Sequence, residues 1–189
     1  MTTHGSDRSW ARLLVARRRS VVARLRARAL ARVLGYECGA RVGLERGVTI
    51  VLDAGGQLSI GARSHISAGS LLHAATGAKL VIGTDTFLGQ NCTVMSKQSI
   101  EIGSQVQIAE LVSIRDHDHR LGASPTSGGL TTSPVVIEDE VWLGAKATVT
   151  RGCHLGRGAV VGAGGVVTHN VAAGAVVVGV PTRPIPGPR

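Results

Sequence analysis

Residues 115–120 hold the densest group of side chains that could carry out acid–base chemistry. The segment places His117 and His119 beside Asp116 and Asp118. Many group-transfer reactions need a base that removes a proton from the attacking group, and imidazole suits that task at neutral pH. Two alternatives stay open at this point. The segment could be a solvated polar turn, or it could bind a metal, because a His-x-His pair can ligate zinc.

A six-residue repeat surrounds this segment and must position it. Within residues 137–172, a large aliphatic residue recurs at Ile137, Leu143, Val149, Leu155, Val161 and Val167. Four positions after each of these stands a small or β-branched residue: Val141, Ala147, Cys153, Ala159, Gly165 and Val171. A helix repeats every 3.6 residues and a strand every two, so a period of six indicates one face of a prism-shaped β-solenoid. We expect the large residues to point inward and the small ones to lie at the corners.

Aliphatic residues at six-residue spacing also occur upstream, in three runs separated by two shifts of register. The runs are Val42, Val48, Ala54, Ile60, Ile66 and Leu72, then Ile82, Leu88, Val94 and Ile100, then Ile102, Ile108 and Ile114. The next member, Ile137, follows Ile114 after 23 positions, which is not a multiple of six. We therefore predict a polar, glycine-rich loop at about 120–134 that leaves the solenoid wall directly after the histidine segment.

Composition limits the chain to one domain with a small appendage. Of the 189 residues, 43% are apolar but only 2% are aromatic, so Val, Ile, Leu and Ala must build the core. The net charge of +9 is concentrated, because residues 1–32 hold nine arginines and one acid. We predict a basic helical arm at 1–35 and a solenoid domain with a C-terminal tail at 36–189.

No apolar run is long enough to span a bilayer, and the basic N-terminus lacks the apolar segment of a signal peptide. We expect the three cysteines to be reduced thiols of a cytoplasmic protein, not a disulfide or zinc set.

The arm has two interpretations. Residues 8–34 lack Gly and Pro and favour a helix, with a broken apolar stripe at Trp10, Leu14, Val21 and Leu25. Such a helix could cover the open first coil of the solenoid, which needs a cap. Alternatively, a basic amphipathic helix could lie on an anionic membrane. Nucleic-acid binding is not expected, since the arm has one aromatic residue and no recognisable binding fold.

Three further motifs resemble one known family. They are Val-Trp-Leu-Gly-Ala at 141–145, Ala-Gly-Gly-Val-Val-Thr at 163–168 and Gly-Val-Pro-Thr-Arg-Pro-Ile at 179–185. With the six-residue repeat, they are similar to the hexapeptide-repeat acyltransferases, and among these to the sugar O-acetyltransferases. The resemblance implies an all-β, left-handed parallel β-helix, although parallel crossovers are right-handed as a rule.

The resemblance also implies a reaction and its residues. It implies transfer of an acetyl group from acetyl-CoA, without a metal, to a hydroxyl of a sugar or glycoside. His117 matches the catalytic base, and Asp116 or Asp118 is expected to orient it. The expected coenzyme A contacts are Gly144, Ala145, Ala163, Thr168, His169 and Arg183, with the Ala145 amide as the oxyanion donor. At His169 the family often has a lysine.

Acceptor binding and assembly complete the expectation. Phe87, Asn91 and Trp142 are acceptor-pocket candidates, because an aromatic face suits a sugar ring. Flat prism walls favour a homotrimer with active sites between subunits, as in the family. The other classes considered are a metal-binding protein of the γ-carbonic anhydrase type, whose histidine pattern His65, His73, His154 and His169 do not reproduce, and a non-catalytic scaffold.

Overall fold

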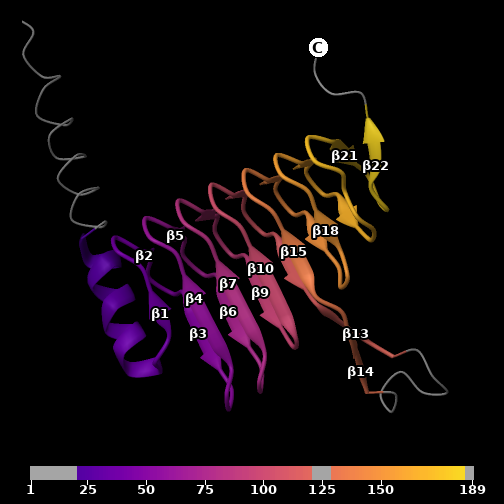
Figure 1. The fold of residues 1–189 in the computed structure, drawn as a ribbon. Helices are drawn as coiled ribbons and strands as arrows, with labels where there is room; N and C mark the ends of the chain where they lie inside the picture. The colour runs from indigo at the N-terminus through magenta and orange to yellow at the C-terminus, as the bar shows by residue number, and fades with distance from the viewer. Residues whose placement is uncertain (1–20, 121–128, 186–189) are drawn as a thin grey trace, which may run out of the picture.

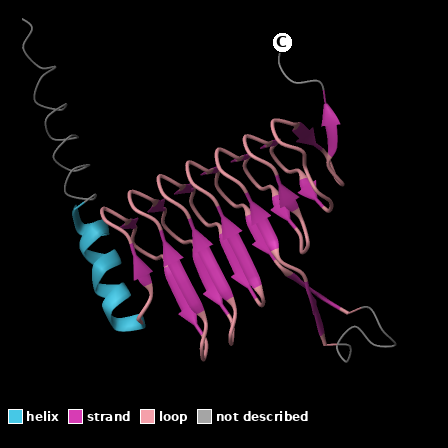
Figure 2. Cartoon of the chain, in the orientation of Figure 1, coloured by secondary structure: helices cyan, strands magenta, loops and turns pink. Residues whose placement is uncertain are grey.

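The chain winds into a parallel β-helix in which three sheets form the walls of a prism (Figures 1 and 2). This description rests on a computed structural model that describes residues 21–120 and 129–185. Each of the first six coils contributes one strand to each sheet, in the order A, B, C along the chain, and the last coil adds two strands to sheet B. A short hairpin leaves the wall between the fourth and fifth coils.

Sheet A contains β1 (Glu37–Cys38), β4 (Gln57–Ile60), β7 (Lys79–Ile82), β10 (Ser99–Ile102), β15 (Val135–Ile137) and β18 (His154–Leu155). Sheet B contains β2 (Gly43–Leu44), β5 (His65–Ile66), β8 (Phe87–Leu88), β11 (Gln107–Ile108), β16 (Trp142–Leu143), β19 (Val160–Val161), β21 (Val176–Val178) and β22 (Arg183–Ile185). Sheet C contains β3 (Thr49–Leu52), β6 (Leu71–Ala74), β9 (Thr93–Ser96), β12 (Ser113–Arg115), β17 (Thr148–Val149) and β20 (Val166–Val167). Within these three sheets, neighbouring strands are parallel except for β22, which runs antiparallel to β21.

The interior is filled by the residues that the six-residue repeat predicts. Ile137, Leu143, Val149, Leu155, Val161 and Val167 are all at most 1% exposed. Their small partners lie at the corners, where Cys92 and Cys153 are also buried. Burial raises the pKa of both thiols, so they are packing groups, and Cys38, Cys92 and Cys153 are all free.

The predicted phase is wrong in the first coil. Leu44 and Ile50 are the strand residues that stack on Ile66 and Leu72, whereas Ala54 is exposed. The pairs Leu44–Ile66 and Ile50–Leu72 are 22 residues apart, so the first coil is longer than three sixes. The additional residues lie in the four-residue strands β3 and β4 and in the corner between them.

The N-terminal helix, residues 21–34 of the described chain, covers the open end of the first coil (Figure 1). Ala23 and Ala27 are buried, and Leu30 and Ala31 pack against the core. The Tyr36 hydroxyl donates to the Ala27 carbonyl at 2.9 Å, and burial raises the pKa of Tyr36. The predicted apolar stripe is not the packing face, because Val21 and Leu25 are exposed, and Trp10 and Leu14 lie outside the described residues.

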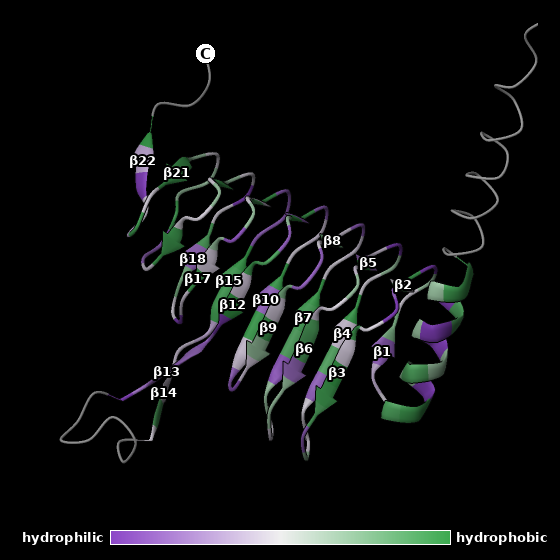
Figure 3. Ribbon diagram, turned by 180° about the vertical axis from the view of Figure 1, so that it is seen from behind, coloured by the Kyte–Doolittle hydropathy of each residue, from purple (hydrophilic) through white to green (hydrophobic). Residues whose placement is uncertain are grey.

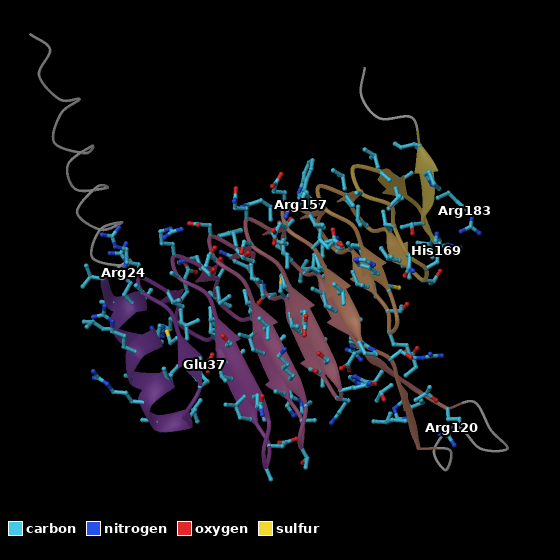
Figure 4. The ribbon with its side chains drawn as sticks, viewed as in Figure 1. Arg24, Glu37, Arg120, Arg157, His169 and Arg183 are labelled. Carbon is cyan, nitrogen blue, oxygen red and sulfur yellow. The ribbon has the colours of Figure 1, made fainter. Side chains whose placement is uncertain are left out.

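The hairpin consists of β13 (His117–His119) and β14 (Leu130–Thr132), paired antiparallel. It projects from the solenoid at the corner between sheets C and A, with Arg120 far from the wall (Figures 1 and 4). Residues 121–128 of the predicted loop lie outside the described residues.

The corners explain why glycine follows several of the large residues. A Cβ on Gly156 would lie 2.6 Å from the Ala173 backbone nitrogen of the next coil. We expect Gly156→Ala to lower the free energy of unfolding by about 3 kcal/mol or more, since no side-chain rotation relieves a clash with backbone.

The matched control is Gly158→Ala in the same corner. Gly158 has a φ of 67° and no atom within 4 Å of the added Cβ, so only left-handed strain of about 1–2 kcal/mol is expected. Urea unfolding of both variants measures the difference, and equal losses would contradict the stacking argument.

Candidate active site

His117 begins the hairpin at the end of a sheet C strand, with its imidazole against a buried carboxylate. Its Nδ1 lies 3.1 Å from Asp116 Oδ1, and the His117 side chain is 10% exposed. An ionised carboxylate only accepts hydrogen bonds, so Nδ1 must carry the proton of this bond. In the neutral ring Nε2 is then the basic nitrogen. The pair is therefore arranged as a base with a fixed tautomer.

Asp116 is fully buried, and its other contacts hold it in place. The backbone amides of Lys97 and Gln98 donate to its carboxylate at 2.8 and 2.7 Å, and Ser96 Oγ lies 3.0 Å from Oδ2. A buried carboxylate is costly unless several donors compensate for the lost water. These contacts supply that compensation and leave the Asp116 side chain with one position.

The departure of the hairpin explains why Asp116 is needed there. In earlier coils the corner amides bond to carbonyls of the following coil, as Ala75 N does to Ser96 O at 2.9 Å. At Asp116 the chain leaves the wall, so the Lys97 amide meets its carboxylate instead of a backbone carbonyl, and the Gln98 amide donates to the same carboxylate. The same carboxylate therefore closes the coil and orients His117.

The neighbouring charged residues take different positions. Asp118 pairs with Arg151 Nε at 3.0 Å and is half exposed, so it does not hold His117. His119 is exposed and pairs with Leu130 across the hairpin. Of the two acids predicted to orient the base, the structure places Asp116 in contact with it. The supporting roles of Ser96, Lys97, Gln98 and Arg151 were not predicted, because only the fold brings them to Asp116 and Asp118.

The predicted coenzyme A residues divide between two edges of the prism. Gly144, Ala145 and Ala163 lie at the corners between sheets B and C, before β17 and β20. Gly144 must lack a side chain, because an added Cβ would lie 2.6 Å from Ala163 N. The Ala145 amide donates to no backbone carbonyl among the described residues.

Thr168 and His169 lie at the other edge, between sheets C and A, on the same side as His117. Because β12 and β17 are parallel and in register, Ala145 before β17 and His117 after β12 stand on opposite edges of sheet C. Those edges are on the order of 15 Å apart, given about 3.3 Å per residue. One subunit therefore does not bring Ala145 and His117 together. Arg183 is exposed on β22, near the C-terminal end of the prism (Figure 4).

Two of the acceptor candidates share the outer surface of sheet B. Phe87 and Trp142 are 39% and 54% exposed, and both pair with Gln107 on the strand between them. His65 stacks on Phe87, with ring centroids 5.9 Å apart and planes 6° apart. Asn91 lies at the B–C corner with a φ of 55°. These candidates belong to the Ala145 side of the prism.

Three further histidines of the described residues each have an acidic partner. His65, His73 and His154 lie 2.8–3.2 Å from Glu45, Asp53 and Glu138. Within residues 21–120 and 129–185, no cluster of three or more His, Cys, Asp or Glu side chains is arranged to hold a metal ion.

The repeat pattern matches a known sequence family. The hexapeptide repeat of succinyl-transferase matches residues 79–109 and 134–169. A protein of Schizosaccharomyces pombe named "Putative acetyltransferase" is 34% identical over 104 residues, which cover 54% of this chain and 50% of the relative. The chain thus spans about half the length of that curated relative.

Solved structures agree with the sequence family. A hexapeptide-repeat containing acetyltransferase from Vibrio cholerae, complexed with acetyl coenzyme A, has a TM-score of 0.56 and 26% identity over 72% of this chain and 69% of its own. Residues 79–109 and 134–169 thus carry the hexapeptide repeat, and the chain resembles acyltransferases built on that repeat. A mutant of AntD, an N-acyltransferase from Bacillus cereus in complex with dTDP-4-amino-4,6-dideoxyglucose and coenzyme A, has a TM-score of 0.74 at 20% identity and covers 86% and 89% of the two chains. The predicted fold class, a left-handed β-helix of hexapeptide repeats, is confirmed.

The two aspartates next to His117 provide a matched test of the site geometry. Asp116→Asn turns one accepting oxygen into a donor that faces backbone amides, so we expect the free energy of unfolding to fall by about 2–3 kcal/mol. Asp118→Asn removes one exposed ion pair and should cost less than about 1 kcal/mol. Denaturant unfolding distinguishes them, and similar values for both variants would contradict the closing role of Asp116.

Proposed function

We propose that the chain transfers an acetyl group from acetyl-CoA to a hydroxyl of a sugar or glycoside, with His117 as the general base. The observation that carries this proposal is the contact between His117 Nδ1 and the fully buried Asp116. A base with one fixed tautomer suits removal of a proton from a weakly acidic hydroxyl. The resemblance to hexapeptide-repeat acyltransferases supports the reaction class, and the coenzyme A complexes of similar proteins support the donor.

Each residue then has a defined task. Acetyl-CoA supplies an activated thioester. His117 Nε2 takes the hydroxyl proton as the acceptor oxygen attacks the carbonyl carbon, and it returns that proton to the departing thiol sulfur. The Ala145 amide, which has no backbone acceptor among the described residues, is suited to stabilise the negative charge on the carbonyl oxygen. Asp116 positions the ring and stabilises its charged form.

The separation of these groups requires a second copy of the chain. Reacting atoms must approach within about 3–3.5 Å, whereas Ala145 and His117 occupy opposite edges of one sheet. Two neighbouring prisms can place the His117 edge of one beside the Ala145 edge of the other. The contact is heterologous, and three such contacts close a ring, so we propose a homotrimer.

The outer surface of sheet B is the proposed acceptor platform. Phe87 and Trp142 stand on either side of Gln107, roughly 10 Å apart at the level of the backbone. A pyranose ring presents C–H groups that pack on exposed aromatic rings, and Asn91 and Gln107 can bond its hydroxyls. His65, held by Glu45 at 3.2 Å, supports the buried side of Phe87.

A second candidate is transfer to an amine on a sugar nucleotide. The similarity to AntD, an N-acyltransferase bound to an aminosugar nucleotide, favours it. The same His117 and Ala145 would serve, and the acceptor platform would bind the aminosugar. An acceptor screen with glycosides and with aminosugar nucleotides distinguishes the two.

Replacement of His117 tests the catalytic role. His117→Ala should lower kcat by about 10²–10⁴-fold, because the proton acceptor is removed. Thiol release from acetyl-CoA with the active acceptor measures the rate, and a coenzyme A thermal shift shows that donor binding is kept. His119→Ala is the matched control and should retain most of the activity. Full activity of His117→Ala would contradict the proposal.

Complementation tests the shared site. Mixed trimers of His117→Ala and Arg183→Ala subunits should recover activity that neither variant has alone, with about a quarter of the interfaces regaining both residues in a random mixture. Assays below the KM for acetyl-CoA report the loss at Arg183. A fully active monomer by light scattering, or mixtures no better than the average of the two variants, would rule out the shared site.

A further inference from the structure

The N-terminal helix has two differently exposed faces, and only one of them packs on the solenoid. Ala23, Ala27 and Leu30 form the buried side, as described above. On the opposite side, Val21 and Leu25 are 48% and 60% exposed. The cap and the surface helix suggested by the sequence are therefore not exclusive, because each would use a different face of the same helix.

The outward face combines apolar and cationic side chains. Val21, Leu25, Arg28 and Arg32 follow the spacing of a single helical stripe and are all exposed. We name these four residues the outward stripe. Arg24 and Arg41 flank it, and with Val21, Leu25 and Arg28 they line a shallow hollow of about 300 Å³. Figure 3 shows hydrophobic and hydrophilic residues alternating along this helix.

The positive charge of the outward stripe indicates which kind of partner it can bind. Residues 21–34 contain four arginines and no acid. Arg24 lies on this helix at the N-terminal end of the solenoid (Figure 4). Like charge opposes contact with a second copy of the same stripe. Residues 21–34 hold no aromatic side chain for stacking on nucleobases, which disfavours nucleic acid. Exposed valine and leucine between arginines match the boundary between lipid phosphates and acyl chains.

We propose that the outward stripe docks the enzyme on an anionic phospholipid surface. The arginines contact lipid phosphates, Val21 and Leu25 enter the interface, and Ala23 and Ala27 keep the helix fixed to the first coil. Such a helix lies in the plane of the interface. Among the described residues no helix is long and apolar enough to cross a bilayer.

Vesicle sedimentation of the full-length chain tests this surface. We expect binding to vesicles of phosphatidylcholine with roughly one third phosphatidylglycerol at low salt and none to phosphatidylcholine alone, and about 0.5 M salt should weaken the binding. Arg24→Gln/Arg28→Gln should lower the partition coefficient about thirtyfold, since each basic residue contributes roughly a fivefold factor.

Two further variants separate the contributions. Val21→Ser/Leu25→Ser keeps the charge and should reduce binding roughly tenfold by removing the apolar contact. Lys79→Gln/Arg157→Gln removes the same charge from exposed ion pairs elsewhere and should leave binding within about twofold. Each variant should keep the thermal midpoint of the unaltered protein, because the exchanged side chains are exposed.

Three outcomes would overturn the proposal. The first is absence of sedimentation with anionic vesicles. The second is equal loss of binding in the Arg24→Gln/Arg28→Gln and control variants. The third is binding of a homopolymeric RNA, abolished by the same arginine exchange, with no vesicle binding.

Discussion

The rest of the structure depends on the in-register stacking of one coil on the next. Parallel hydrogen bonds between coils fix their separation, so each corner must fit against the corner that follows. That spacing excludes a Cβ at Gly83, where an added atom would lie 2.4 Å from a carbonyl carbon of Gly103. It also aligns the inward residues into continuous columns of Ile, Leu and Val. The six-residue period is the sequence consequence of this geometry.

Functional groups occur where the stacking is interrupted. At the hairpin the chain leaves the wall, and the Lys97 amide loses the carbonyl that stacking would supply. A buried carboxylate replaces that carbonyl and also accepts the Gln98 amide, and His117 is the next residue. The requirement to satisfy two backbone amides therefore places a rigid acid beside an imidazole. A structural requirement also places a functional surface at the N-terminal end. There the first coil needs a covering helix, and the other face of that helix remains exposed.

Much of the fold could be predicted from residue spacing, and the errors have physical causes. The columns from Ile137 to Val167 were located correctly because those coils contain only two- and three-residue strands and short corners. The first coil was misplaced because four-residue strands lengthen it, and alternation within a longer strand offers two possible phases, such as Val48 and Ile50. In the site, Asp116 and His117 are consecutive in the chain, so their proximity was visible in the sequence.

The sequence by itself determined the solenoid, because a repeat imposes the same local geometry on every coil. It also determined where the hairpin interrupts the repeat and that histidine and aspartate stand there. Only the tertiary structure decided that Asp116, and not Asp118, contacts the His117 ring. Asp116 is held in place by backbone amides that lie 18 and 19 residues earlier in the chain. The tertiary structure also decided the separation of His117 from Ala145. Each residue follows a short strand in the sequence, His117 a strand of sheet C and Ala145 a strand of sheet B. Only the parallel register shows that the two residues occupy opposite edges of sheet C.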